Sequence, residues 1–300
     1  MAEVLPAVTP RFPVALTLPS PVQEVADGWL ARAGVRLLLK RDDLISPEFP
    51  GNKWRKLALN LDAARRQGHG VLLTFGGAYS NHIRATAAAG HFFGFSTIGV
   101  IRGEEHRPLN PSLAAAVRYG MRLTYLDRSA YRAKAEPAVL TALRDRFGDF
   151  YLLPEGGSNA HAARGCAGIP AEITVPFDVM CCPCGTGGTL AGLAAGLGRD
   201  QRAVGFAALK GGQFLTPAVA ALQTEAFGAR TANWSVDDRF HFGGFARRTA
   251  ELDRFIAAFA RRHGLTLDWV YVAKMMYGIF ALAEQGFFGH GATVVALITG

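Results

Sequence analysis

The chain has 300 residues, of which half are hydrophobic and 19% are charged, so it can form one large or two modest globular domains. The formal net charge is +8, but the Lys and Arg residues are spread along the chain among Asp and Glu, which argues against a nucleic-acid partner. No hydrophobic run is long enough for a membrane-spanning helix, which argues against a membrane protein.

The N-terminal segment Met1–Pro6 has neither the basic start nor the apolar run of a signal peptide. We therefore expect a cytoplasmic protein with reduced cysteines. The residues before Val35 are rich in Pro and predict irregular structure.

After this segment, predicted strands and helices alternate almost to the C-terminus. The expected strands are Val35–Lys40, Val71–Phe75, Ser96–Arg102, Arg122–Leu126, Tyr151–Leu153, Phe177–Cys181, Ala203–Leu209 and Thr293–Ile298. The expected helices begin at Lys53, include Ala85–Phe93, open at Asn110-Pro111, and continue with Pro137–Phe147, a helix from His161, Leu190–Gly196, Gln213–Phe227, one capped by Thr249, and Lys274–Glu284. This alternation predicts an α/β fold with parallel-rich, open twisted sheets that carry helices on both faces.

The first candidate for chemistry is Lys53, in the segment Pro50-Gly51-Asn52-Lys53. Asn52 is a good helix N-cap, which places Lys53 on the first turn, where the helix dipole favours a neutral amine over an ammonium. A neutral lysine amine can attack a carbonyl and form a Schiff base. The alternative is an ordinary surface helix start with Lys53, Arg55 and Lys56 in water.

A second candidate turn follows the strand that ends at Phe75. Ser80, Asn81 and His82 bring hydrogen-bond donors and a titratable ring to a helix start, which suits carboxylate binding or proton shuttling near neutral pH. The alternative is a helix cap, in which Ser80 or Asn81 satisfies exposed backbone N–H groups.

Three of the four cysteines, Cys181, Cys182 and Cys184, crowd into one predicted strand end, and the fourth is Cys166. Adjacent side chains of a strand point to opposite faces, and a second Cys pair is missing, so a zinc site is disfavoured. We expect no metal and interpret these cysteines as small buried hydrophobic residues.

A glycine-rich turn follows these cysteines and consists of Gly185, Thr186, Gly187, Gly188 and Thr189. Lying between a strand and a helix, its backbone N–H groups and the helix N-terminus would form a cup for a phosphate. It matches neither a Walker loop nor the dinucleotide-binding glycine pattern. The alternative is a turn whose glycines serve close packing alone.

Near the C-terminus, Tyr271, Lys274 and Tyr277 lie at a predicted loop-to-helix junction. Lys274 and Tyr277 would share one helix face, and a tyrosine can act as a general acid–base group when a cation lowers its pKa. The alternative is packing for Tyr277 and a solvated Lys274. Thr299 lies at the end of the last predicted strand, and its position alone does not indicate a function.

Taken in order, these motifs resemble a known family. The motifs are Lys40-Arg41-Asp42-Asp43-Leu44, Gly51-Asn52-Lys53, Ser80-Asn81-His82, Gly185 to Thr189 with Ala191-Gly192, Lys274 to Gly278, and Thr299-Gly300. From about Lys40 to the C-terminus the chain is similar to the D-cysteine desulfhydrase and 1-aminocyclopropane-1-carboxylate (ACC) deaminase family. These are pyridoxal-phosphate enzymes of the tryptophan-synthase-β-like fold, also called fold type II.

The resemblance implies how the cofactor is held. Lys53 would bind it covalently and move protons. The backbone of Gly185, Thr186, Gly187, Gly188 and Thr189 would hold the phosphate, with Lys56 as a cationic neighbour. Asn81 would contact the phenolic oxygen, and Thr299 would hydrogen-bond the pyridine nitrogen. A hydroxyl at that position does not force the ring to be protonated, which favours elimination.

The resemblance also implies substrate contacts and an architecture. Ser80, Asn81 and His82 would bind the substrate, and Tyr277 or Tyr271 would face it from the other side. Two α/β domains with a cleft between them are expected: residues 51–151 as a smaller domain inserted into a large cofactor-binding domain of residues 1–50 and 152–300. A homodimer is expected as well.

For the substrate, the family implies a small amino acid. His82 and Thr299 resemble the desulfhydrase branch, so α,β-elimination of D-cysteine to pyruvate, sulfide and ammonia is the first expectation. ACC deamination and turnover of another small amino acid are alternatives, because the segments Trp269–Ala273 and Leu209–Gln213 depart from the family's usual residues. Outside enzymes, the alternatives are a pyridoxal-phosphate-binding protein with little turnover and a nucleotide-binding α/β module.

Overall fold

The computed structural model describes residues 8–300, so the interpretation of Met1–Pro6 lies outside the described residues. The described chain divides into two compact units, each with its own sheet. Unit 1 holds the residues up to Leu16 and Ser46–Ala162, and unit 2 holds Thr17–Ile45 and Ala163–Gly300. The assignment of residues 51–151 as an inserted domain, with the remainder as the cofactor-binding domain, stays a prediction.

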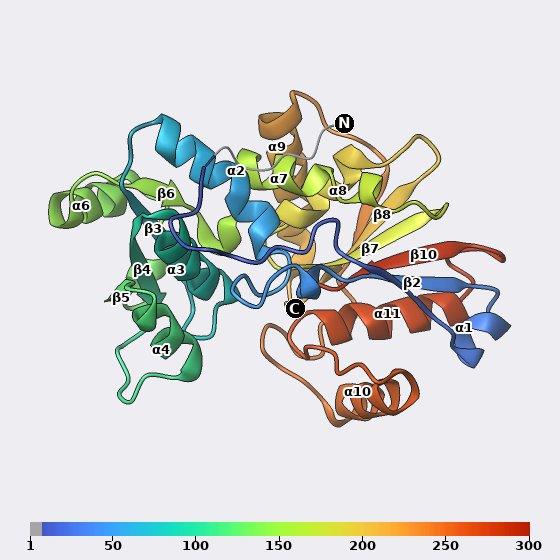
Figure 1. The fold of residues 1–300 in the computed structure, drawn as a ribbon. Coiled ribbons are helices and arrows are strands. Elements are labelled where there is room, and N and C mark those ends of the chain that lie inside the picture. Colours follow the sequence, from blue (N-terminus) through green and yellow to red (C-terminus); the bar gives the residue numbers. More distant parts are fainter. Residues whose placement is uncertain (1–7) are drawn as a thin grey trace. The chain divides into compact units, whose positions relative to one another are not determined.

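Unit 1 is built on a four-stranded sheet with the order β5-β4-β3-β6, in which every pair is parallel (Figure 1). Its elements are α2 (Lys53–Arg66), β3 (Val71–Gly76), α3 (Asn81–Phe93), β4 (Ser96–Arg102), α4 (Pro111–Arg118), β5 (Arg122–Leu126), α5 (Arg128–Arg132), α6 (Pro137–Phe147), β6 (Tyr151–Leu153) and the 3-10 turn η2 (Glu155–Gly157). Helix α7 (Ala160–Ala167) begins in this unit and ends in unit 2. Strands β3 and β4 are buried along most of their length because both faces of a parallel sheet are covered by helices.

The two faces of this sheet bury two separate apolar clusters. Ile98 and Val100 of β4 point to a cluster that Tyr131 and Leu143 of α5 and α6 complete. Ile101 points to the other face, where it packs with residues of α3 and α4. The alternation along β4 therefore follows from the two-residue period of a strand.

Unit 2 is built on a six-stranded sheet with the order β1-β2-β10-β7-β8-β9 (Figure 1). Only the edge pair β1–β2 is antiparallel among the described strands of this sheet. Its elements are β1 (Val22–Val25), α1 (Gly28–Arg32), β2 (Arg36–Lys40), η1 (Asp42–Leu44), η3 (Pro170–Glu172), β7 (Val179–Cys184), α8 (Gly188–Gly196), β8 (Arg202–Ala207), η4 (Gly212–Phe214), α9 (Leu215–Phe227), β9 (Trp234–Asp237), α10 (Ala250–His263), α11 (Val272–Glu284) and β10 (Thr293–Leu297).

Helices cover both faces of this second sheet. Helices α8 and α9 lie on one face, and α11 lies on the other with α10 and α1 beside it (Figure 1). Helix α8 is apolar around most of its circumference because it packs between the sheet and α9. The predicted α/β fold with parallel-rich sheets and helices on both faces is confirmed.

Several expected elements differ from the structure. The residues before Val35 are not irregular throughout, because they contain β1 and α1. Strand β7 begins two residues later than expected and continues to Cys184, and β9 was not expected at all. Helix α11 begins at Val272, so Lys274 lies inside its first turn.

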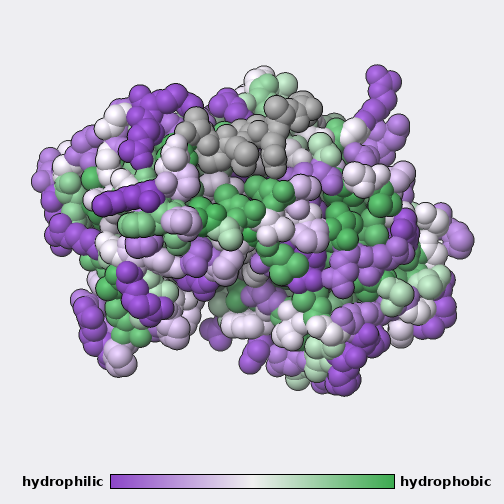
Figure 2. Space-filling view, viewed as in Figure 1, coloured by the Kyte–Doolittle hydropathy of each residue, from purple (hydrophilic) through white to green (hydrophobic). Residues whose placement is uncertain are grey.

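On the surface drawn in Figure 2, hydrophobic residues are interspersed with hydrophilic ones. Large exposed apolar side chains such as Trp29, Tyr79 and Phe214 belong to different elements and loops. Within residues 8–300, no helix combines the length and the apolar character needed to cross a membrane.

Candidate functional site

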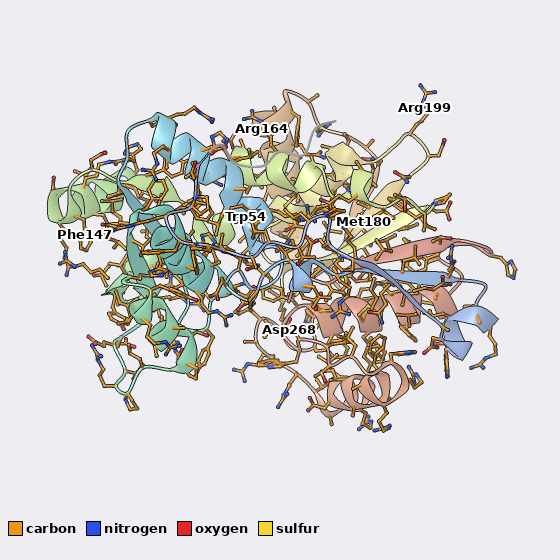
Figure 3. All side chains as sticks on the ribbon, viewed as in Figure 1. Trp54, Phe147, Arg164, Met180, Arg199 and Asp268 are labelled. Carbon is orange, nitrogen blue, oxygen red and sulfur yellow. The ribbon has the colours of Figure 1, made fainter. Side chains whose placement is uncertain are left out.

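Lys53 is the first residue of helix α2, as predicted, and its side chain is half-buried. Asn52 occupies the N-cap position, but its side chain makes no capping hydrogen bond. Instead, its Oδ1 accepts from Lys53 Nζ at 3.3 Å. The solvated alternative for this helix start is wrong, because Arg55 and Lys56 are only 7% and 6% exposed. Trp54, labelled in Figure 3, packs against the rings of Phe49 and Phe93 and anchors the same turn.

Lys56, one helical turn after Asn52, reaches the turn that follows β6. Its Nζ donates to the carbonyl oxygen of Gly156 at 3.2 Å and lies 3.5 Å from Ser158 Oγ. Gly156 and Gly157 both have positive φ, near 66°, a backbone conformation that glycine adopts without strain. The ammonium of Lys56 therefore ties the α2 start to a glycine turn within unit 1.

A buried amide network, which the sequence analysis missed, holds the same turn. Asn60 Nδ2 donates to the Lys56 carbonyl at 2.6 Å, and Asn159 Nδ2 donates to Asn60 Oδ1 at 2.7 Å. The hydroxyl of Tyr151 donates to Asn60 Oδ1 at 3.0 Å. The local signal was the Gly156 to Asn159 stretch directly after a strand, but its partner Asn60 lies almost a hundred residues earlier.

Ser80 and Asn81 lie at the start of helix α3. Ser80 Oγ accepts from the backbone N–H of Ile83 at 3.3 Å, so the capping alternative holds for this residue. Asn81 is the first residue of the helix, and both side chains are half-buried. A helix N-terminus with two polar side chains can receive an anionic group such as a carboxylate.

His82 is buried beneath this turn. Its Nε2 lies 2.9 Å from Thr74 Oγ1, and that hydroxyl donates to the carbonyl oxygen of Leu153 at 2.9 Å. The hydroxyl proton is thus in use, and His82 Nε2 carries the hydrogen that Thr74 accepts. A Cβ on Gly157 would lie 2.8 Å from His82 Cε1, so the imidazole packs directly against the glycine turn.

Burial controls the protonation of His82. Desolvation, followed by the nearby positive charges of Lys53 and Lys56, lowers its pKa to about 3. The imidazole is therefore neutral near pH 7, and the interpretation of His82 as a proton shuttle near neutral pH is wrong. Its Nδ1 has no hydrogen-bond partner among the described residues.

The glycine-rich turn of unit 2 joins β7 to α8. Gly187 is the N-cap of α8 with φ of 82°, and a Cβ there would lie 2.7 Å from Val219 Cγ2. Both the backbone angle and the space therefore require glycine at this position. The first N–H groups of α8 and the turn from Gly185 form a cradle whose chemistry fits a phosphate, and Thr186 and Thr189 flank it.

Tyr271 lies against the start of this turn. A Cβ on Gly185 would lie 3.3 Å from Tyr271 Cε1 and 3.4 Å from its hydroxyl oxygen. Asp268, labelled in Figure 3, fixes the backbone of Tyr271 because its carboxylate accepts from the N–H groups of Val270, Tyr271 and Val272 at 3.1, 2.7 and 3.2 Å. The structure thus brings Tyr271 and the glycine turn together within unit 2.

Tyr277 is engaged elsewhere. Its hydroxyl donates to the carboxylate of Glu251, and its ring packs against Phe240, Phe242 and Phe255. The hydrogen bond to Glu251, with burial, raises the pKa of Tyr277 to about 12. This direction is opposite to the lowered pKa that a general acid–base role would need, and the ring contacts agree with the alternative of packing for Tyr277.

Lys274 is buried, so the alternative of a solvated Lys274 is wrong. It is 1% exposed, and its Nζ donates to the carbonyl oxygens of Ala208 and Gly244 at 3.0 and 2.8 Å. Thr299 is buried and is the second residue after β10, which lies between β2 and β7. It therefore follows a central strand of the sheet whose neighbour β7 leads into the glycine turn.

The four cysteines are buried thiols, which confirms their interpretation as small hydrophobic residues. Burial raises the pKa of Cys181, and a contact with Cys184 raises that of Cys182 as well. Neither thiol is therefore primed as a nucleophile. Across residues 8–300, no group of three or more His, Cys, Asp or Glu side chains is arranged to hold a metal ion.

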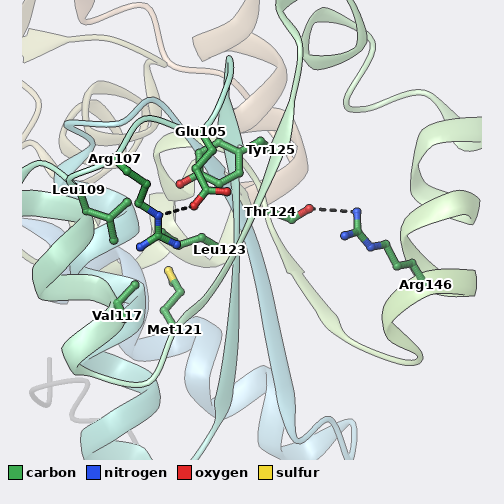
Figure 4. Close-up of a pocket in the computed structure, with 9 residues that line it drawn as sticks. All are labelled: Glu105, Arg107, Leu109, Val117, Met121, Leu123, Thr124, Tyr125 and Arg146. Carbon is green, nitrogen blue, oxygen red and sulfur yellow. Dashed lines mark hydrogen bonds and ion pairs between the residues drawn. The ribbon is translucent and has the colours of Figure 1, made fainter.

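A pocket of about 490 Å³ opens on unit 1 beside β5 (Figure 4). Its lining includes Arg107 and Arg146, but Arg107 pairs with Glu105 and Arg146 donates to Thr124. None of the predicted site residues lines this pocket. It therefore does not replace the two groups of residues described above.

Comparison with known proteins shows the family to which the chain is similar. A family model described as "Pyridoxal-phosphate dependent enzyme" matches residues 18–300. The chain is 31% identical over 298 residues to a Pyrococcus horikoshii protein named "Putative 1-aminocyclopropane-1-carboxylate deaminase". The aligned region covers 94% of this chain and 90% of that protein. The chain is also 29% identical over 293 residues to a D-cysteine desulfhydrase of Yersinia pestis, covering 89% and 87%.

A solved structure described as an ACC deaminase homologue superposes with a TM-score of 0.84 at 29% identity, covering 97% of this chain and 92% of that one. These findings confirm the resemblance, the cofactor and the predicted fold class. The chain belongs to the family of pyridoxal-phosphate-dependent enzymes.

Proposed function

We propose that this chain is a lyase that performs α,β-elimination on a small amino acid, with D-cysteine as the first candidate. One water and one D-cysteine would yield pyruvate, hydrogen sulfide and ammonia. The observation that carries the proposal is Lys53: its amine lies on the first turn of a buried helix, next to a second lysine that is tied to a glycine turn. The name of the Yersinia pestis relative, a D-cysteine desulfhydrase, supports this reaction.

Pyridoxal phosphate supplies the electron sink that makes the substrate Cα–H bond acidic. Lys53 would bind the cofactor aldehyde through its amine and then carry the proton that leaves Cα. The backbone N–H groups at Gly185 to Thr189 would hold the phosphate, and Thr299 would bond to the pyridine nitrogen through its hydroxyl. These groups fit the cofactor because the turn has a dipole, N–H donors and a glycine that no other residue can replace.

Ser80 and Asn81 would bind and orient the substrate, and Asn81 would also contact the phenolic oxygen of the cofactor. Both side chains sit at the start of α3, where a carboxylate is favoured. His82 would act beneath them as a neutral support because it is buried and its pKa lies far below 7. Lys56 would add positive charge near the phosphate, and Tyr271 would contact the substrate from the glycine-turn side.

ACC deamination is the second candidate, and the name of the Pyrococcus horikoshii relative favours it. Against it stand His82 and Thr299, which resemble the desulfhydrase branch. A pyridoxal-phosphate-binding protein with little turnover is the non-enzyme alternative. A homodimer and a cytoplasmic location stay predictions.

The test is product release by purified holoenzyme. D-cysteine, L-cysteine and ACC are supplied in parallel, pyruvate and 2-oxobutyrate are quantified, and Lys53→Ala serves as the matched inactive control. Pyruvate from D-cysteine alone supports the proposal, and 2-oxobutyrate from ACC alone supports the second candidate. A yellow protein inert towards all three would overturn both candidates. A wider screen of small amino acids then separates a lyase with another substrate from a binding protein with little turnover.

A further inference from the structure

Lys274 is a buried ammonium that joins two segments far apart in the sequence. One carbonyl partner, Ala208, directly follows β8, and the other, Gly244, lies in the loop of residues 240–248. A buried lysine needs such partners, because an unpaired ammonium away from water is costly. Burial lowers the pKa of Lys274 to about 8, and the negative charge of Asp268 acts in the opposite direction.

The 240–248 loop carries backbone strain at the point where Lys274 holds it. Phe242 and Ala246 have φ of 50°, which is uncommon for residues other than glycine, and Gly244 between them has φ of 123°. Such a conformation persists only when the surroundings enforce it. The bond from Lys274 to the Gly244 carbonyl, at 2.8 Å, is the buried contact at the centre of this stretch.

The loop reaches the glycine turn through two aromatic rings. Phe245, the residue after Gly244, is 47% exposed and meets Tyr271 edge-on, with 5.7 Å between ring centroids. Tyr271 in turn lies against Gly185. A contiguous path therefore runs from Lys274 through the loop to the start of the phosphate cradle, all of it inside unit 2.

We propose that Lys274 is a positioning residue: its ammonium clamps the 240–248 loop so that Phe245 holds Tyr271 against the glycine turn. The clamp makes Phe245 a determinant of which substrate side chains are accepted. Phe245 is 47% exposed, and an exposed aromatic ring favours apolar or sulfur-containing side chains over charged ones. This inference rests on the proposed function, because Tyr271 matters for the substrate only if the glycine turn serves the cofactor.

The test compares Lys274→Met with Lys210→Met. Methionine reproduces the lysine side chain as far as Cε but lacks the ammonium, so it leaves both carbonyls unpaired. Lys210 is an exposed lysine whose backbone lies beside Gly244. The first readout needs no cofactor: the rate of tryptic cleavage after Arg247 and Arg248, both exposed in this loop. We expect Lys274→Met to raise this rate about tenfold and Lys210→Met to leave it unchanged.

The second readout is steady-state kinetics of pyruvate release. If the loop positions Tyr271 for substrate binding, Lys274→Met raises KM about tenfold with a smaller change in kcat. Lys274→Gln keeps N–H donors and should restore part of both effects, and it replaces the Met variant if that variant does not fold. Phe245→Ala should lower the ratio of kcat/KM for D-cysteine to kcat/KM for D-serine. The thiol of D-cysteine gains from contact with the aromatic ring, whereas the hydroxyl of D-serine does not.

Unchanged cleavage and unchanged KM in a folded Lys274→Met protein would overturn the inference. Faster cleavage with unchanged kinetics would also overturn it, because the loop would then be clamped without serving the substrate. If the wild-type protein turns over no amino acid, the proposed function has failed, and cleavage still reports separately whether the clamp exists.

Discussion

The Nε2 atom of His82 lies 2.9 Å from the hydroxyl of Thr74, whose own proton goes to the Leu153 carbonyl. This arrangement fixes a neutral imidazole beneath the Gly156–Gly157 turn, and Lys56 holds the same turn through the Gly156 carbonyl. His82 is thereby a support for the lysine-bearing part of unit 1.

The neutral state of His82 predicts acid sensitivity. Its pKa is about 3 in the folded protein and near 6.5 when unfolded, so between these values the unfolded chain binds more protons. The free energy of unfolding therefore falls as pH drops from 6.5 towards 3, by about 2 kcal/mol from this group at pH 5. Urea unfolding at pH 7 and pH 5 measures the loss.

His82→Gln should remove this part of the pH dependence, whereas His106→Gln, at an exposed histidine of the same unit, should keep it. If the His82→Gln protein loses as much stability between pH 7 and pH 5 as the wild type, His82 is not held neutral.

Gly187→Ala should damage the phosphate cradle. The substituted residue would have to keep a left-handed backbone conformation, and its Cβ would also clash with a methyl group of Val219. The control, Gly228→Ala, has a similar φ of 78°, but its Cβ would have no atom within 4 Å. We expect the control to cost about 1 kcal/mol of stability and Gly187→Ala about 1–3 kcal/mol more. Only Gly187→Ala should weaken pyridoxal phosphate binding in an absorbance titration, and equal affinity in the two variants would argue against the cradle.

The two tyrosines should respond differently to loss of their hydroxyls. Tyr271→Phe removes a hydroxyl that lies beside Gly185, and we expect kcat/KM to fall at least about tenfold. Tyr277→Phe removes a bond to Glu251 and should change kcat/KM less than about threefold. The reverse order of effects would assign the substrate contact to Tyr277.

Short runs rich in apolar residues made the strands β4, β5 and β6 readable from the sequence, and all three have the expected bounds. The short edge strand β1 was missed because Gln23 and Glu24 are exposed and interrupt any apolar pattern. Pro183 explains the error at β7, since proline is unusual in a central strand. Beyond Cys181, however, β7 pairs only with β8, so Pro183 lies where backbone hydrogen bonds are needed on one side of the strand alone.

In the candidate site, local patterns located Lys53, Ser80 and the glycine turn, because helix starts and glycine clusters are encoded by adjacent residues. The partners of His82, Lys274 and Tyr277 could not be read in this way. Lys274 bonds to Gly244 and Tyr277 to Glu251, 30 and 26 residues away, and no local periodicity marks such pairs. His82 bonds to Thr74, but the partner of that hydroxyl, Leu153, lies 79 residues further along the chain.

The central claim is that Lys53 carries the cofactor. Borohydride reduction of the holoenzyme followed by peptide mass mapping tests it directly, because reduction fixes the pyridoxyl group on the lysine that holds it. We predict the added mass on Lys53 and its loss, together with at least about a hundredfold loss of elimination activity, in Lys53→Ala. A pyridoxyl group on Lys56 or any other lysine, or retained labelling in Lys53→Ala, would contradict the account.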